Sequence, residues 1–164
     1  MDKNLIQLVE NKVIDTLLLA QEKLKQNFEI PIISFNLKSS RIAGLAYRNS
    51  WMIKINPAFL ERFTEKTLIE VVPHEITHLL TYKLFPFAKQ HHGPEWRNVN
   101  MRMGLALSRC HSMVLPEHKP YAYKCSCQTH FVSNIIRKRI SEGQRITCRK
   151  CKSGLVYLGK NINQ

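Results

Sequence analysis

The sequence contains no membrane-length hydrophobic run, no internal repeat and no low-complexity tract. A membrane-spanning helix needs about 20 apolar residues, and the longest apolar run of the N-terminal region extends only from Leu17 to Ala20. Residues Met1 to Asn4 lead directly into a patterned helix, so we expect no targeting segment. These absences favour a soluble, cytoplasmic protein with no membrane partner.

Acidic residues are almost absent from the C-terminal quarter of the chain. Residues 119–160 contain ten lysines and arginines but one acid, Glu142, so this segment carries nine of the thirteen net positive charges. A charge distribution this uneven favours a polyanionic partner, above all nucleic acid. A basic tail that only keeps the protein soluble would have a similar composition.

Cysteine is equally uneven, because four of the five cysteines fall in the same basic segment. In the absence of a secretory signal, such a cluster predicts a metal site before it predicts disulfides. The remaining one, Cys110, is expected to be a small buried hydrophobic residue. We place a linker at 108–120 and expect two domains, residues 1–118 and residues 119–164.

The pattern of apolar residues predicts an α+β fold. Apolar residues at helical spacing predict an amphipathic helix over residues 4–28. Runs of β-forming residues predict three strands of a small antiparallel sheet, at 32–37, 43–47 and 51–55. A second group of strands is expected in the basic segment, including 130–136 and 145–148 joined by a basic turn.

Helix-start signals predict the remaining helices. Asn56 is a candidate cap for a helix whose first residue is Pro57, and Thr64 is a candidate cap for a helix over 65–84. Pro73 lies inside this second helix and predicts a kink or a local widening just before His74. A further helix is expected from Pro94 to about residue 107.

The helix over 65–84 carries the motif His74-Glu75-Ile76-Thr77-His78. Residues i and i+4 share one face of a helix, so His74 and His78 can bind one zinc ion. Glu75 lies about 100° further round the helix, where it can reach a water at an open metal position. This arrangement is typical of a zinc hydrolase.

A catalytic zinc needs a third protein ligand. Leu84 and Phe85 stand where an elongated zinc-protease motif would place its third histidine, so that pattern is excluded. We favour His92 over His91, because Gly93 lets the backbone turn tightly beside a metal. Glu95 could also ligate, although an acid in a first helical turn commonly serves the helix dipole.

The basic segment carries a second candidate metal site. Cys148 and Cys151 form a two-residue chelating turn typical of structural zinc. Cys125, Cys127 and His130 offer three ligands for the other two places, and we favour Cys125 with Cys127 because thiolates suit structural zinc. Two Zn²⁺ ions are therefore expected, one catalytic and one structural.

The basic turn Arg137-Lys138-Arg139 is expected to contact DNA phosphates. Four aromatic residues of the same segment could stack on bases, although each is more commonly part of a small core. These residues are Tyr121, Tyr123, Phe131 and Tyr157.

The combination of His74-Glu75-x-x-His78, His92-Gly93-x-x-Trp96 and the two cysteine pairs resembles the SprT family, over about residues 30–158. These are bacterial zincin-like proteins related to the Spartan-type proteases that repair DNA–protein crosslinks. The resemblance implies a zincin-like metalloprotease domain followed by a zinc ribbon. It also implies that His74, His78 and His92 bind zinc and that Glu75 is the catalytic acid/base.

The expected function is therefore DNA-associated zinc metallopeptidase activity on a protein substrate, with a role in DNA repair. Zinc would polarise the scissile carbonyl while Glu75 transfers a proton from water to the leaving amine. Tyr82, Arg97 or His111 could stabilise the oxyanion, and the spacing does not choose among them. The alternative is a zinc-containing nucleic-acid-binding adaptor without proteolytic activity, against which the intact Glu75 argues.

Overall fold

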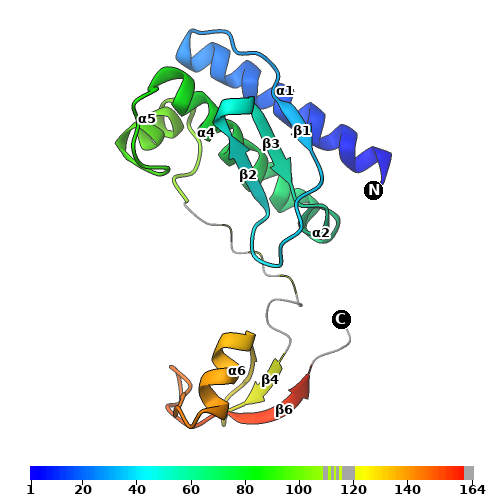
Figure 1. The fold of residues 1–164 in the computed structure, drawn as a ribbon, viewed down its shortest axis with the longest axis vertical. Coiled ribbons are helices and arrows are strands. Elements are labelled where there is room, and N and C mark those ends of the chain that lie inside the picture. The colour runs from blue at the N-terminus through cyan, green and yellow to red at the C-terminus, as the bar shows by residue number, and fades with distance from the viewer. Residues whose placement is uncertain (109–110, 112, 114, 116–120, 161–164) are drawn as a thin grey trace. The chain divides into compact units, whose positions relative to one another are not determined.

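The computed structural model describes residues 1–108, 111, 113, 115 and 121–160 (Figure 1). The chain divides into two compact units, Met1–Met113 and Val114–Gln164. Cys110 and the expected domain boundary after residue 118 lie outside the described residues. None of the described helices is both long enough and apolar enough to cross a membrane.

Helices and one small sheet make up the first unit. Its helices are α1 (Lys3–Leu24), α2 (Pro57–Arg62), α3 (Thr64–Lys66), α4 (Val72–Leu84) and α5 (Pro94–Met103). Its strands are β1 (Ile32–Ser34), β2 (Gly44–Tyr47) and β3 (Met52–Ile55). A 3-10 turn at Arg48–Ser50 joins β2 to β3, and a π-helical turn at Thr67–Val71 joins α3 to α4.

The sheet has the order β1-β3-β2. The β2–β3 pair is antiparallel, as predicted, but β1 runs parallel to β3, so the prediction of a wholly antiparallel sheet was wrong. The reason is topological: the segment between β1 and β2 carries the chain to the far edge of the sheet before the hairpin returns it to the centre. β2 is thereby left as an edge strand that contacts α4.

Helix α4 lies at the centre of the first unit. It contacts α1, α5, β2 and β3, and in Figure 1 the strands lie in front of it. Its apolar residues Ile76, Leu79 and Leu80 are fully buried. Burial of this kind fixes the direction of every α4 side chain, because a rotation of the helix would expose apolar surface and bury its charges.

The helix ends differ from the predictions in ways that the backbone explains. The first helix ends at Leu24 because Lys25 adopts a left-handed conformation with φ of 58°. The helix from Pro94 ends at Met103 because Gly104 provides the left-handed cap. Asn56 caps α2 as predicted, whereas the Thr64 hydroxyl donates to the Leu60 carbonyl and caps nothing.

The expected widening before His74 is confirmed. Residues 67–71 form a π-helical turn directly ahead of Pro73. Proline lacks an N–H and its ring clashes with the carbonyl four residues earlier in an α-helix. A wider turn removes that clash, so the helix continues through Pro73 to Leu84.

The second unit is a three-stranded antiparallel sheet with one helix. Its elements are β4 (Tyr121–Lys124), β5 (Thr129–Val132), α6 (Asn134–Ser141) and β6 (Val156–Lys160), and the strand order is β5-β4-β6. Ile136 and Ile140 of α6 pack against a small core of Tyr121, Tyr123 and Val132. The unit therefore buries few side chains.

Three expectations for this unit were wrong. The strand predicted over 130–136 ends at Val132, and Arg137, Lys138 and Arg139 lie on α6 instead of a turn. The apolar pair Ile136 and Ile140 has helical spacing, and both members pack on the core only if this segment is a helix. In the region predicted as a strand over 145–148, an isolated bridge joins Thr147 to Gly154.

Candidate metal centres

The structure brings the ring nitrogens of three histidines together. His74 Nε2 lies 3.1 Å from His78 Nε2 and 3.1 Å from His92 Nε2. Four-coordinate zinc bound to imidazole nitrogens at about 2.0–2.1 Å would separate them by about 3.4 Å. The three side chains can hold a metal ion together, and their donor set and spacing fit zinc.

Two segments position these histidines. His74 and His78 stand one turn apart on α4, whose burial fixes their direction. His92 precedes α5, where a β-carbon on Gly93 would lie 3.0 Å from both Gln90 Cβ and Glu95 Oε2. The glycine therefore lets the loop fold closely enough to bring His92 against α4.

Trp96 packs against the histidine cluster. Its ring centroid lies 5.2 Å from that of His74, 5.7 Å from His78 and 4.7 Å from His92, and its side chain is buried. The tryptophan of the His92-Gly93-x-x-Trp96 motif thus touches all three candidate ligands. An apolar wall beside a metal site excludes water and restrains the rings.

His74 and His78 are held in the neutral form that metal binding requires. Burial, followed by the charge of His92, lowers the pKa of His74 to about 4, against a hydrogen bond to the Ser108 backbone that raises it. Burial and the neighbouring His74 lower the pKa of His78 to about 3. Their lone pairs are therefore free of protons at neutral pH.

Glu75 is a buried carboxyl group beside the cluster. Burial raises its pKa to about 8, and a hydrogen bond from the backbone N–H of Ala46 opposes that shift. In its ionised form, which a bound cation would favour, a carboxyl with a raised pKa is a stronger base than an exposed one. The strand β2 therefore orients the one acidic group of the motif.

Gly44 explains how β2 comes so close to α4, and the motif analysis missed it. A β-carbon on Gly44 would lie 2.6 Å from Val71 Cγ1, 2.8 Å from Glu75 Cγ and 2.9 Å from Glu75 Oε1. No side chain fits there. A glycine inside a strand pattern is a signal for close backbone approach, and that signal could have identified this position.

The remaining candidates of the first unit lie around the cluster. The Tyr82 hydroxyl lies 3.2 Å from His91 Nδ1, and the His91 ring centroid lies 6.0 Å from that of His78. Arg97 lines a hollow of about 420 Å³ together with His91 and His92. His111 is close enough to lower the pKa of His74, and its ring packs on Phe59.

Glu95, the acid that could also have been a ligand, is half-buried in the first turn of α5.

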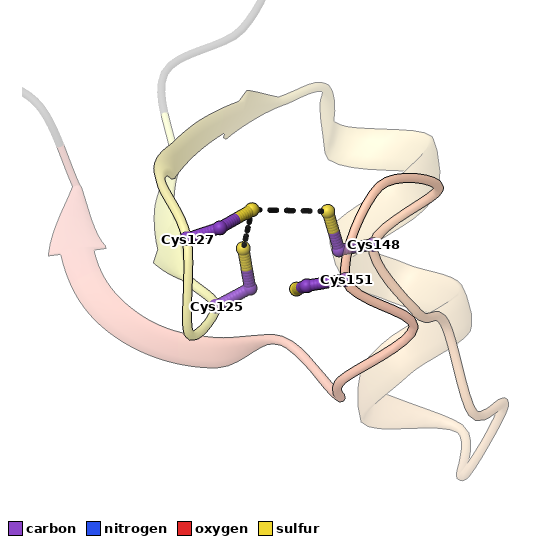
Figure 2. A group of neighbouring side chains, drawn as sticks. All are labelled: Cys125, Cys127, Cys148 and Cys151. Atoms are coloured by element: carbon purple, nitrogen blue, oxygen red, sulfur yellow. Dashed lines mark hydrogen bonds between the residues drawn. The ribbon is translucent and has the colours of Figure 1, made fainter.

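A second group that can hold a metal ion lies in the C-terminal unit, where Cys125, Cys127, Cys148 and Cys151 converge. Figure 2 shows the four side chains pointing toward one another from two loops. The Cys125 and Cys127 sulfurs are 3.5 Å apart, and those of Cys127 and Cys148 are 3.8 Å apart. Tetrahedral zinc with Zn–S bonds of about 2.3 Å would separate its sulfurs by about 3.8 Å.

The loop that carries Cys148 and Cys151 prepares these two sulfurs for a cation. All four cysteines are free thiols. The Lys150 backbone N–H donates to Cys148 Sγ at 3.4 Å, and hydrogen bonds from Ser153 lower the pKa of the Cys151 thiol to about 5. His130 Nε2 lies 3.2 Å from Cys125 Sγ, where it can donate to that sulfur without displacing it from the cluster.

The chain is similar to a family of known proteins. The profile of the SprT-like family matches residues 13–115. Protein SprT of Vibrio parahaemolyticus is 30% identical over 99% of this chain and 100% of its own length. Protein SprT of Pasteurella multocida is 33% identical over 90% of this chain and 91% of its own.

The chain belongs to the SprT-like family. The family profile covers the histidine cluster of this SprT-like protein, and the full-length relatives also span its cysteine cluster. No solved structure matches the chain. The recognition of the family from the motif set is confirmed.

Proposed function

We propose that this SprT-like protein is a zinc-dependent metallopeptidase with a zincin-like catalytic domain. The observation that carries the proposal is the convergence of His74, His78 and His92 beside the buried carboxyl of Glu75. Three imidazole ligands leave a fourth position open, which distinguishes catalytic from structural zinc sites. A purely structural site would have no need of a desolvated acid beside it.

The chain's own residues account for the proton transfers. When bound, zinc would acidify water and polarise the scissile carbonyl. Glu75 accepts a proton from the attacking water as the oxygen–carbon bond forms, and delivers it to the amine nitrogen as the carbon–nitrogen bond breaks. The N–H of Ala46 keeps the carboxyl oriented during both transfers.

The four cysteines are proposed to bind a second, structural zinc ion. A unit of about 50 residues buries too little apolar surface to be stable without a metal, a disulfide or a partner. The core of this unit consists of three buried residues and their partly buried neighbours. A metal that links both loops would supply the missing stability.

The basic helix α6 is proposed to contact DNA. Arg139 is exposed, and Lys138 forms one exposed ion pair with Glu142 at 3.7 Å, which is weak in water. The Arg137 guanidinium lies 4.4 Å from the centroid of the Tyr121 ring, which holds it at the surface. The substrate would be a protein bound or crosslinked to DNA.

Metal analysis should find two zinc ions per chain. His92→Ala is expected to lose one of them, because two histidines alone bind zinc far more weakly than three. The double variant Cys148→Ser/Cys151→Ser should lose the ion of the cysteine cluster and keep the ion of the histidine cluster. His92→Ala should show the reverse. His91→Ala is the matched control. Two ions in His92→Ala would contradict the three-histidine site.

Replacing Arg137, Lys138 and Arg139 with glutamine should weaken DNA binding and its dependence on salt. Each lost phosphate contact reduces the magnitude of the slope of log K against log salt by about 0.9. The slope of the triple variant should therefore be smaller in magnitude by about two to three. Lys3, Lys38 and Lys66→Gln make the same charge change on the first unit. An equal effect of both triple variants would mean that charge alone matters and α6 has no special role.

The test of the proposed function is cleavage of a protein crosslinked to DNA by the zinc-loaded chain, with and without the DNA strand. Chelation should stop cleavage, and added zinc should restore it. Cleavage of the same protein should be slower without DNA. If the zinc-loaded protein binds the conjugate and cleaves nothing, the adaptor hypothesis replaces this one.

A further inference from the structure

A cleft of about 640 Å³ lies on the first unit, outside the histidine cluster. Three segments line it: the stretch after α1 with Phe28, the β2–β3 turn with Arg48 and Trp51, and the end of α4 with Tyr82 and Lys83. Its volume falls in the range of small-molecule sites, about 300–1,000 Å³. Apart from Tyr82, a candidate to stabilise the oxyanion, none of these residues has a role in the metal centre or in the proposed DNA helix.

Trp51 has a backbone conformation that disfavours its side chain. Its φ is 46°, in the left-handed region, where a bulky residue is strained by about 1–2 kcal/mol relative to glycine. The indole N–H donates to the Glu29 carbonyl at 2.9 Å, which fixes the ring beside the cleft. The ring is half-buried, so it is held in place and still accessible.

Two cations stand beside aromatic rings in the same cleft. The Arg48 guanidinium lies 4.8 Å from the Tyr82 ring centroid, and Lys83 Nζ lies 5.9 Å from the Trp51 ring. Among the described residues, ion pairs join Lys23 to Glu22 and Lys138 to Glu142, so neither cation of the cleft has a carboxylate partner. Both side chains therefore remain available to an anion.

We propose that this cleft binds single-stranded nucleic acid, with a base stacked on the aromatic wall and a phosphate held by Arg48 and Lys83. A nucleotide matches both features of the cleft. Its base can stack on the flat aromatic surfaces, and its phosphate can pair with the two cations. An acidic peptide would satisfy the cations alone and leave Trp51 without a stacking partner. Glu29 also lines the cleft, and its backbone carbonyl accepts the hydrogen bond from the Trp51 indole.

The cleft lies next to the histidine cluster, and this position matters if the proposed peptidase function holds. Tyr82 lies one helical turn after His78 on α4, and its hydroxyl contacts His91, whose ring lies near that of His78. A strand in the cleft would run beside the metal centre. A protein attached to that strand would then be held at high effective concentration next to the scissile-bond site.

Intrinsic fluorescence of the full-length protein tests the site, because the chain has two tryptophans and Trp96 is buried. Titration with an oligothymidylate of about five nucleotides should quench Trp51 through base stacking. Arg48→Gln with Lys83→Gln should weaken this binding by about tenfold or more at low salt. Trp51→Phe should abolish the quenching, since Trp96 alone remains.

Matched variants separate this site from the rest of the protein. Arg62→Gln with Lys66→Gln makes the same charge change outside the cleft and should leave the quenching unchanged. The triple α6 variant should also retain it, so a failure of the α6 proposal leaves this test intact. Absence of quenching, or full quenching of the Arg48/Lys83 variant, overturns the proposal. Equal or stronger quenching by a glutamate-rich peptide would assign the cleft to protein instead.

Discussion

Replacing Glu75 with glutamine is expected to lower the peptidase rate by about a thousandfold, the typical contribution of a general base. Glutamine has nearly the same shape as glutamate, so the packing against β2 should remain. It cannot accept a proton from water at neutral pH. Both proposed zinc ions should stay bound, because Glu75 is not among the converging ligand atoms.

The measurements are initial rates on a DNA–protein conjugate, metal content and thermal unfolding. Glu70→Gln is the matched control, because Glu70 is an exposed acid just ahead of the same helix. Among the described residues Glu75 has no ion-pair partner, so removal of its buried carboxyl should leave stability unchanged or slightly higher. A Glu75→Gln variant that cleaves at the wild-type rate would exclude the role proposed for this residue.

Gly44→Ala is expected to impair both folding stability and catalysis. The new β-carbon would lie within 3 Å of Val71 and Glu75, so the strand or the carboxyl must move. Overpacking of this kind destabilises proteins by about 1–3 kcal/mol, and a displacement of about 1 Å at a catalytic group can reduce the rate about a hundredfold. Urea unfolding and cleavage rates measure the two effects separately.

A second substitution distinguishes the two contacts. Val71→Ala removes the Cγ1 atom that the new β-carbon meets at 2.6 Å, so the double variant should be more stable than the sum of the single effects. Its cleavage rate should remain low, because the clash with Glu75 persists. Gly154→Ala, with open space around its β-carbon position, is the control. Full recovery of the rate would show that Gly44 acts through packing alone.

The geometry of the candidate metal centres could largely be predicted from the sequence, because it depends on the spacing of ligand residues within short segments. His74 and His78 stand four residues apart on one helix, so a single element determines their approach. His92 reaches the other two histidines from a loop, and Gly93 directly after it indicated where the chain could turn tightly. The pair Cys148 and Cys151 is likewise set within one turn, and the structure brings Cys125 and Cys127 to it.

The features that could not be predicted depend on contacts between distant segments. The parallel pairing of β1 with β3 follows from a crossover that leaves no local signal. The helix α6 was predicted as strand and turn because Ile135 and Ile136 suit a strand, and the packing of Ile136 and Ile140 on the core decides otherwise. The closeness of β2 to Glu75 depends on a glycine that is 31 residues away in the sequence.

The π-helical turn at Thr67–Val71 sets the rotational phase of the motif. Thr67 is buried and its hydroxyl donates to the Phe59 carbonyl at 3.2 Å, so the start of the turn is fixed to α2. A π-turn contains one residue more than an α-turn, and one residue corresponds to about 100° of rotation. Deleting a single residue here would turn His74, Glu75 and His78 away from His92 while every side chain of the motif remained present. The length of this turn is thus as necessary to the candidate metal centre as the three histidines.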